Sequence, residues 1–217
     1  MKSFAVIGLG RFGSNLAKTL FSLGYEVMAV DEDEERVARI SDYVTHAVVG
    51  DARDEGVLKS IGIRNVDCVV VALSGDMQSS ILVTLLLKEM GVKFILSKAM
   101  SEVHARVLTK VGADQIVFPE KDMGMRVAQS LAMNNILDFI ELSEEYSIVE
   151  VVMPERWAGK TLRDLNVRAN YGVNIMAIRH EQTKEISVSP NPDEELIAGD
   201  ALIIIGTNDD ITQITKL

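Results

Sequence analysis

The chain has 217 residues, of which 47% are hydrophobic, and it carries a formal net charge of −10. This apolar fraction supports a folded core and excludes an intrinsically disordered chain, while the acidic balance argues against a nucleic-acid binder, which needs a basic face. A single cysteine, Cys68, and a first segment that opens on a strand pattern without a signal peptide indicate a cytoplasmic protein.

Apolar β-branched runs alternate with helical patterns over the first 120 residues. The strands are expected at 4–7, 25–30, 46–49, 66–72, 93–96 and 115–118, and the helices at 13–23, 33–41, 54–60, 76–90 and 101–111. A glycine that can adopt a left-handed conformation follows four of these helices, as Gly24, Gly62, Gly91 and Gly112. Such alternation indicates parallel βαβ units, so we predict an α/β fold with a Rossmann-type, doubly wound sheet of six parallel strands.

The pattern changes after Pro119. Residues 120–137 are predicted to form one helix with a broad apolar surface, which either packs on its own sheet or crosses to a second copy of the chain. Further strands are expected at 145–154, 173–180, 184–190 and 200–207, and further helices at 160–166 and 208–217. We therefore predict two domains, a Rossmann domain with a crossover helix over 1–141 and a small α+β domain over 142–217. The second could barely bury a core alone, so we expect it to dimerise.

The segment "FAVIGLGRFGSNLAKTL" joins the first strand to the first helix. Its glycines Gly8, Gly10 and Gly13 have the spacing G-x-G-x-x-G, in which they permit a tight turn, close approach of a pyrophosphate and close packing of helix on strand. The helix N-terminus then offers unpaired N–H groups to an anion. Asp31 ends the second strand, where it can accept hydrogen bonds from both ribose hydroxyls and repel a 2′-phosphate, so NADP is disfavoured.

Two residues inside the turn, Arg11 and Phe12, extend the candidate site. An arginine here is unusual for a dehydrogenase loop, and its guanidinium suits a terminal phosphate. Glu120 follows the sixth strand; facing a phosphate, it would require a divalent cation between the two groups. The sequence alone favours the alternative, a first-turn glutamate stabilised by the helix dipole.

Polar residues also follow the third and fifth strands, at the same expected edge of the sheet. Asp51, followed by Ala52, could meet adenine or ribose, or it could cap a helix. Lys98 could face the phosphates or remain solvated. None of the three histidines has metal-ligand spacing or a paired acid, and no tyrosine precedes a lysine by four residues. The sequence therefore offers no catalytic relay, and we do not expect an enzyme.

Several stretches together resemble one family of regulators. "FAVIGLGRFG", "EVMAVDEDEERV", "THAVVGDARDE", "IGIRNVDCVVVAL", "TLLLKEMGV" and "GADQIVFPEKDMGMRVAQSL" are similar to the cytoplasmic gating subunits of Ktr-type potassium transporters, which belong to the RCK (KTN, or TrkA-N plus TrkA-C) family. The likeness continues through "LSEEYSIVEVVMP" and "DLNVRANYGVNIMAIRH". It covers nearly the whole chain and is more specific than the glycine loop.

The resemblance implies a potassium-transport function. The subunit would form an octameric ring of dimers, peripheral to the inner face of the membrane, under a potassium-translocating subunit. Its N-terminal domain would bind ATP or ADP, and the two nucleotides would bias the ring towards open or closed states. Arg11 matches an arginine that reaches the terminal phosphate of a neighbouring subunit, and Glu120 matches a carboxylate linked to a divalent cation, Mg²⁺ or Ca²⁺.

The resemblance also implies a second ligand, cyclic di-AMP, in the C-terminal domain between two chains. The matching positions are Arg168, Ala169, Asn174, Ile175 and Pro190. An arginine suits a phosphodiester and apolar residues suit an adenine face, but Asn170 stands where close relatives often carry lysine. A nucleotide sensor that gates potassium uptake is thus the first hypothesis. An NAD(H) sensor and an NAD-dependent oxidoreductase are the alternatives.

Overall fold

The computed structural model describes residues 2–73, 75–132 and 136–217. These form two compact units, residues 1–121 and residues 122–217, and each is described by itself. The predicted domain boundary at residue 141 stays a prediction. The compact units show how the contacts within the chain are distributed, but they do not test which segment works as a separate domain.

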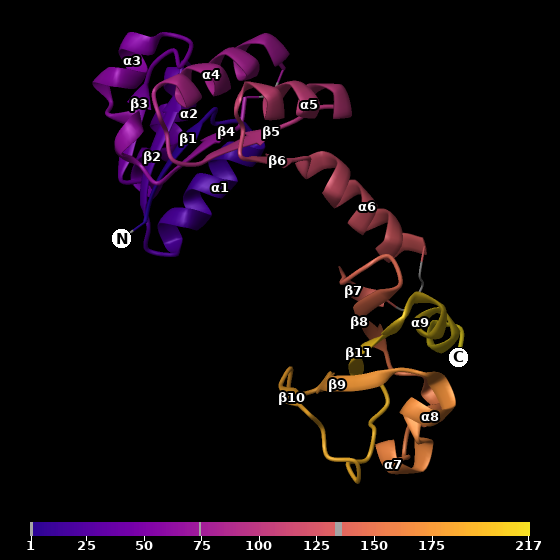
Figure 1. Cartoon of the computed structure of the whole chain (residues 1–217). Coiled ribbons are helices and arrows are strands. Elements are labelled where there is room, and N and C mark those ends of the chain that lie inside the picture. Colours follow the sequence, from indigo (N-terminus) through magenta and orange to yellow (C-terminus); the bar gives the residue numbers. More distant parts are fainter. Residues whose placement is uncertain (1, 74, 133–135) are drawn as a thin grey trace. The chain divides into compact units, whose positions relative to one another are not determined.

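The first unit is built on a six-stranded, fully parallel sheet in the order β3-β2-β1-β4-β5-β6 (Figure 1). Its strands are β1 (Ser3–Ile7), β2 (Glu26–Asp31), β3 (His46–Val49), β4 (Cys68–Val71), β5 (Ile95–Lys98) and β6 (Gln115–Val117). Its helices are α1 (Arg11–Ser22), α2 (Glu34–Ile40), α3 (Glu55–Ser60), α4 (Met77–Glu89) and α5 (Glu102–Val111), with short 3₁₀ turns at Ser41–Tyr43 and Ile63–Asn65. The predicted doubly wound Rossmann-type sheet is confirmed.

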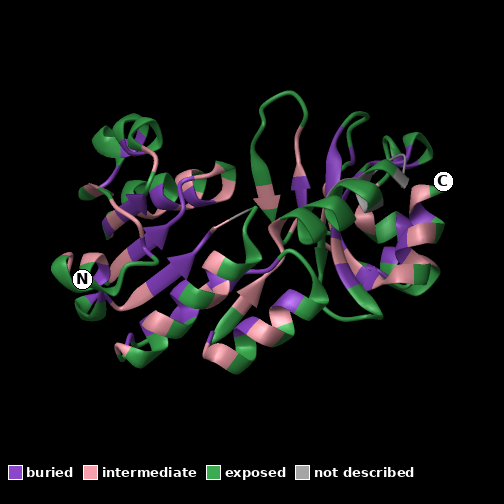
Figure 2. Cartoon of the chain, turned by 90° about the horizontal axis from the view of Figure 1, so that it is seen from above, coloured by how far each residue is buried: buried purple, intermediate pink, exposed green. Residues whose placement is uncertain are grey.

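Both faces of this sheet are covered, as the alternation of side chains requires (Figure 2). Ala5 and Ile7 of β1 pack in a cluster with residues of α3 and α4, while the intervening Val6 packs in a second cluster with residues of α1 and α2. The four glycines expected to end helices all have positive φ: +86° at Gly24, +69° at Gly62, +75° at Gly91 and +114° at Gly112. These local predictions are confirmed.

At the opposite edge from the strand ends that bear the candidate residues, Asp67 ties three segments together. Its carboxylate accepts hydrogen bonds from the Ser3 backbone at 3.0 Å and from Lys93 Nζ at 2.7 Å. The Lys93 ammonium and the two Ser3 donors lower the pKa of Asp67 to about 2. His46 lies exposed on β3, an edge strand of the sheet.

The second unit contains a five-stranded antiparallel sheet in the order β10-β9-β11-β8-β7. The strands are β7 (Ile136–Glu141), β8 (Tyr146–Val152), β9 (Asn174–Arg179), β10 (Ile186–Val188) and β11 (Ala201–Thr207). The helices are α7 (Leu162–Leu165), α8 (Val167–Tyr171) and α9 (Asn208–Thr215), with a 3₁₀ turn at Glu155–Trp157. One apolar cluster, which includes the fully buried Trp157, forms the core. Strands β9 and β10 pair as an antiparallel hairpin, and Thr161 caps the start of α7.

The predicted helix over 120–137 is too long. Helix α6 runs from Pro119 to Ala132, and Ile136 and Leu137 belong to strand β7; residues 133–135 of the prediction lie outside the described residues. A short apolar run is compatible with the periodicity of a helix and with that of a strand. Here the run forms a strand because β7 pairs with β8. Helix α8 was not anticipated.

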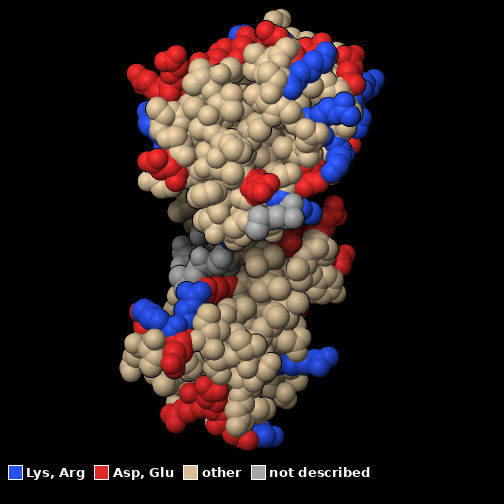
Figure 3. Space-filling model, turned by 90° about the vertical axis from the view of Figure 1, so that its left-hand side faces the viewer, with Lys and Arg blue, Asp and Glu red and all other residues tan. Residues whose placement is uncertain are grey.

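No helix in the described part of the chain has the length and apolar composition needed to cross a bilayer. On the face in Figure 3, acidic and basic side chains are interspersed around broad uncharged areas. That face offers no continuous basic surface of the kind that nucleic acid requires.

Candidate functional site

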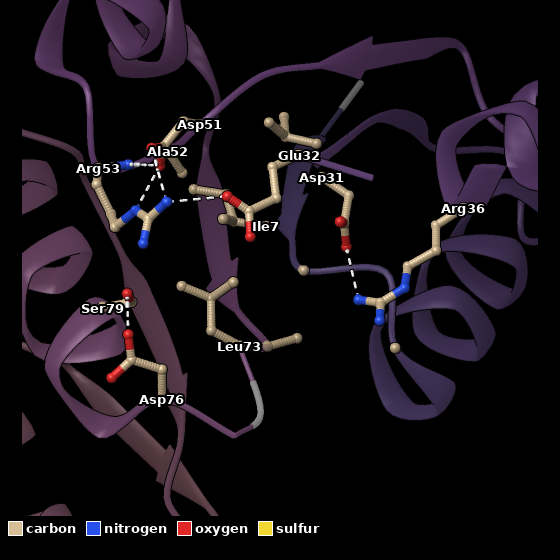
Figure 4. Close-up of a pocket in the computed structure, with 14 residues that line it drawn as sticks. Ile7, Asp31, Glu32, Arg36, Asp51, Ala52, Arg53, Leu73, Asp76 and Ser79 are labelled. Carbon is tan, nitrogen blue, oxygen red and sulfur yellow. Dashed lines mark hydrogen bonds and ion pairs between the residues drawn. The ribbon is translucent and has the colours of Figure 1, made fainter. Parts of the chain in front are cut away.

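A cavity of about 150 Å³ opens at the carboxyl ends of the central strands of the parallel sheet (Figure 4). Five residues expected at a ligand site line it: Gly8, Gly10, Asp31, Asp51 and Ala52. In open α/β sheets ligands bind in this crevice, beyond the carboxyl ends of the strands. The cavity is therefore the first candidate for a functional site.

The glycine turn shapes one wall of this cavity. Gly8 has a φ of +95°, and a Cβ there would lie 2.9 Å from the carbonyl carbon of Ala72. A Cβ on Gly13 would lie 1.9 Å from the Gly8 carbonyl oxygen, so only glycine lets α1 approach β1 this closely. Gly10 is the N-cap of α1 and its position provides no side-chain cap. The first N–H groups of α1 thus remain open to an anionic ligand.

Asp31 does more than the sequence predicted. Its side chain is buried; Oδ2 accepts a hydrogen bond from the Leu9 backbone N–H at 2.6 Å, and Oδ1 accepts one from Asp33 at 3.0 Å. Arg36 Nη1 lies 3.5 Å from Oδ2. A carboxylate has about four acceptor positions, so room remains for a hydroxyl donor. Asp31 holds the glycine turn to the end of β2 and still faces the cavity.

Charged groups that were not predicted from the sequence close the cavity on the β3 side. Arg53 makes a bidentate contact with Asp51, with Nε 2.8 Å from Oδ1 and Nη2 2.9 Å from Oδ2, and its Nη2 also lies 2.9 Å from Glu32 Oε2 (Figure 4). The hydrogen bond from Arg53 lowers the pKa of Asp51. Asp76 and Ser79, at the start of α4, form a further wall and are hydrogen-bonded to each other. The available signal was the position of Glu32 directly after β2 and of Arg53 in the segment that follows β3.

Lys98, Glu120, Arg11 and Phe12 lie outside the lining of this cavity, and so does Gly13. Lys98 is buried, and its Nζ lies 2.5 Å from Glu120 Oε1 and 6.0 Å from the centroid of the Phe12 ring. The hydrogen bond from Lys98 lowers the pKa of Glu120, with a smaller contribution from the charge of Arg11. The alternative of a solvated Lys98 is therefore wrong. Lys98, Glu120 and Arg11 form one charged cluster beside the start of α1.

Glu120 is the residue proposed from the sequence for a metal. Within residues 2–73, 75–132 and 136–217, no group of three or more His, Cys, Asp or Glu side chains gathers in a way that could hold a metal ion. Its neighbour in this chain is the Lys98 ammonium. A divalent ion at Glu120 would need further oxygen ligands, such as those of phosphates or of a second chain.

A second cavity, of about 400 Å³, lies in the C-terminal unit. Four of the five residues expected to bind a second ligand line it: Arg168, Asn174, Ile175 and Pro190. Ala169 does not. Arg163 adds a second guanidinium, which Asp193 holds with contacts of 2.6 Å and 3.1 Å. The structure thus brings most of this predicted group together.

Comparisons with known proteins point to one family for both units of the chain. Residues 4–119 match the TrkA-N domain and residues 146–217 match the TrkA-C domain. The chain is 51% identical over 215 residues to the Ktr system potassium uptake protein C of Bacillus subtilis (strain 168). The matched region covers 99% of this chain and 96% of that protein.

Two solved structures are also similar. The GsuK channel bound to NAD has a TM-score of 0.53 and 26% identity, over 100% of this chain and 38% of that one. GsuK bound to ADP has a TM-score of 0.53 and 25% identity, over 61% of this chain and 34% of that one. The first similarity includes the unit that contains the glycine turn, because it covers the whole chain.

Proposed function

Because the chain belongs to the family of RCK proteins that join a TrkA-N domain to a TrkA-C domain, we propose that nucleotides bound in its N-terminal unit gate a membrane potassium-translocating subunit. The chain is a Ktr-type potassium uptake regulatory protein, and that family is not enzymatic. The resemblance noted from the sequence is thereby confirmed, and the oxidoreductase alternative falls. We propose in particular that the nucleotides bound by the N-terminal unit are ATP and ADP.

One observation carries the nucleotide proposal. The uncapped start of α1, the Gly8–Gly10 turn and the buried Asp31 meet at one cavity, which matches a phosphate group followed by a ribose. The solved structure of GsuK bound to ADP is consistent with this choice of ligand. NAD(H) remains the alternative, because GsuK has also been solved with NAD. Competition titrations of ATP, ADP, NAD and NADH against the purified protein separate the two.

The charged cluster of Arg11, Lys98 and Glu120 supports a response to the terminal phosphate. Arg11 is the first residue of α1 and its side chain is exposed, so it can reach a phosphate held by a neighbouring chain in an octameric ring of dimers. Glu120 would join the phosphate oxygens in holding Mg²⁺ or Ca²⁺, which would supply charge neutralisation between anions. A ligand shifts a conformational equilibrium only as far as it prefers one state.

Substituting Arg11 tests this mechanism. Arg11→Ala is expected to lower the preference for ATP over ADP by about tenfold or more, since a charge-assisted hydrogen bond contributes about 1.5–3 kcal/mol. The affinities are measured by calorimetry on the full chain, and activation is measured as potassium flux with the pore subunit in vesicles. Lys18→Ala, later in the same helix, is the control and should change neither the nucleotide affinities nor the potassium flux. If Arg11→Ala keeps the ATP preference and the flux response, the mechanism is wrong.

The second cavity supports a further ligand, cyclic di-AMP. Arg168 can pair with a phosphodiester, and Ile175 and Pro190 can lie against adenine. Arg168→Ala is expected to weaken cyclic di-AMP binding by about tenfold to a hundredfold, as measured by calorimetry on the full chain. Arg156→Ala, an exposed arginine outside this cavity, should bind as the wild type does. If calorimetry detects no heat when cyclic di-AMP is added to the wild-type protein, the proposal of cyclic di-AMP as a ligand is wrong.

A further inference from the structure

The order of the strands sets the direction in which a bound nucleotide extends. Helix α1 begins after β1, Asp31 ends β2, and β3 is the edge strand beside β2. A nucleotide with its phosphates at α1 and its ribose at Asp31, as proposed above, therefore places its base towards the segment that follows β3. That segment carries Asp51, Ala52 and Arg53.

We infer that Arg53 is the platform on which the base stacks, and that it makes the site selective for purine nucleotides. Arg53 lines the cavity, and its planar guanidinium joins Asp51, in the segment after β3, to Glu32, after β2 (Figure 4). A guanidinium stacks on aromatic rings through its flat face, and a larger ring system covers more of that face. The inference rests on the proposed function, because it names a determinant of the same site.

The hydrogen bonds of Arg53 favour this role over phosphate binding. Nε and Nη2 both donate to carboxylates, with contacts of 2.8 Å and 2.9 Å to Asp51 and of 2.9 Å to Glu32. A phosphate ligand would have to compete with two carboxylates for those donors. The side chain is 44% exposed, which leaves guanidinium surface for a ligand. Three contacts also hold the plane in one orientation, so little side-chain entropy remains to be lost on stacking.

The charges around the cavity give Arg53 a second effect. Asp31, Glu32, Asp51 and Asp76 line the cavity, and the arginines that line it are Arg36, beside Asp31, and Arg53, beside Glu32 and Asp51. Removal of Arg53 would leave two carboxylates unpaired beside the base and would repel any polyanion. A variant that keeps the charge but loses the plane is needed to separate stacking from electrostatics.

Arg53→Lys is that variant, and Arg53→Ala removes both properties. Dissociation constants for ATP, CTP and inorganic tripolyphosphate are measured by calorimetry on the full chain, and thermal unfolding confirms that each variant is folded. Arg39→Ala, on the exposed end of α2 and outside the cavity, is the matched control. The wild type is expected to prefer ATP over CTP. Arg53→Lys should lower ATP affinity by about threefold to thirtyfold while tripolyphosphate affinity stays within about twofold.

Several results would overturn the inference. If a variant lost the same affinity for ATP, CTP and tripolyphosphate, Arg53 would act through its charge alone. If Arg53→Ala bound ATP more tightly than the wild type, the Arg53 side chain would obstruct the nucleotide. Unchanged ATP binding in both variants would give it no role. Each of these requires that the wild type binds ATP, so failure of the wild type to bind any nucleotide is a separate result that rejects the proposed function itself.

Discussion

Replacement of Gly13 by alanine is expected to destabilise the N-terminal unit by about 3 kcal/mol or more and to abolish binding of ATP and ADP. The added Cβ would lie 1.9 Å from the Gly8 carbonyl oxygen and 3.2 Å from the Ala72 Cβ. The first contact is with backbone, which cannot rotate away as a flexible side chain can. Either α1 must move away from β1 or the glycine turn must open, and both changes disrupt the proposed phosphate site.

A matched control separates this steric effect from the general effect of replacing glycine. Gly124 lies in α6, where a Cβ built on it would meet no described atom within 4 Å apart from its chain neighbours and the backbone of its own helix. Gly124→Ala should stabilise the chain slightly, by at most about 1 kcal/mol, because alanine favours the helix. Thermal unfolding and nucleotide titration are measured on both variants. A Gly13→Ala protein that unfolds at the wild-type temperature and binds ATP normally would refute the argument for close packing at this turn.

The N-terminal fold was predictable because its signals are local. The β-branched runs, the three-glycine turn and the glycines with positive φ each depend on a few neighbouring residues, and together they determine a parallel sheet. Gly8, Gly10 and Asp31 follow directly from this pattern, since the fold brings the ends of β1 and β2 to one edge. Their meeting at a single cavity is a consequence of topology that the sequence already contained.

Other parts of the site depend on register, which the sequence does not reveal. The Arg53–Glu32 contact exists because β2 and β3 pair with Asp31 beside Val49, which brings the segments that follow these strands together. The burial of Lys98 and its pairing with Glu120 likewise depend on the β5–β6 register. The boundary of α6 was misjudged for a related reason, because partners in β8 decide that Ile136 and Leu137 form a strand.

Asp31→Ala should combine loss of stability with loss of binding, which distinguishes it from a residue that only contacts the ligand. The substitution removes the acceptors for the Leu9 and Asp33 backbone N–H groups and leaves the first, which is buried, without a partner. An unsatisfied buried donor costs about 1–3 kcal/mol, so we expect a loss of about 2–4 kcal/mol from both groups together. The glycine turn loses its tie to β2, and affinity for ATP and ADP should fall at least about tenfold.

Two comparison variants make the test of Asp31 specific. Asp42→Ala removes an exposed carboxylate from the turn after α2 and should leave both unfolding and binding unchanged. Asp31→Asn keeps one oxygen acceptor but presents an amide N–H₂ to a backbone donor, so it should fall between the wild type and Asp31→Ala in stability. Denaturant unfolding and calorimetry are run on all three. If Asp31→Ala lost affinity without any loss of stability, Asp31 would act on the ribose alone, and its role in holding the glycine turn would be wrong.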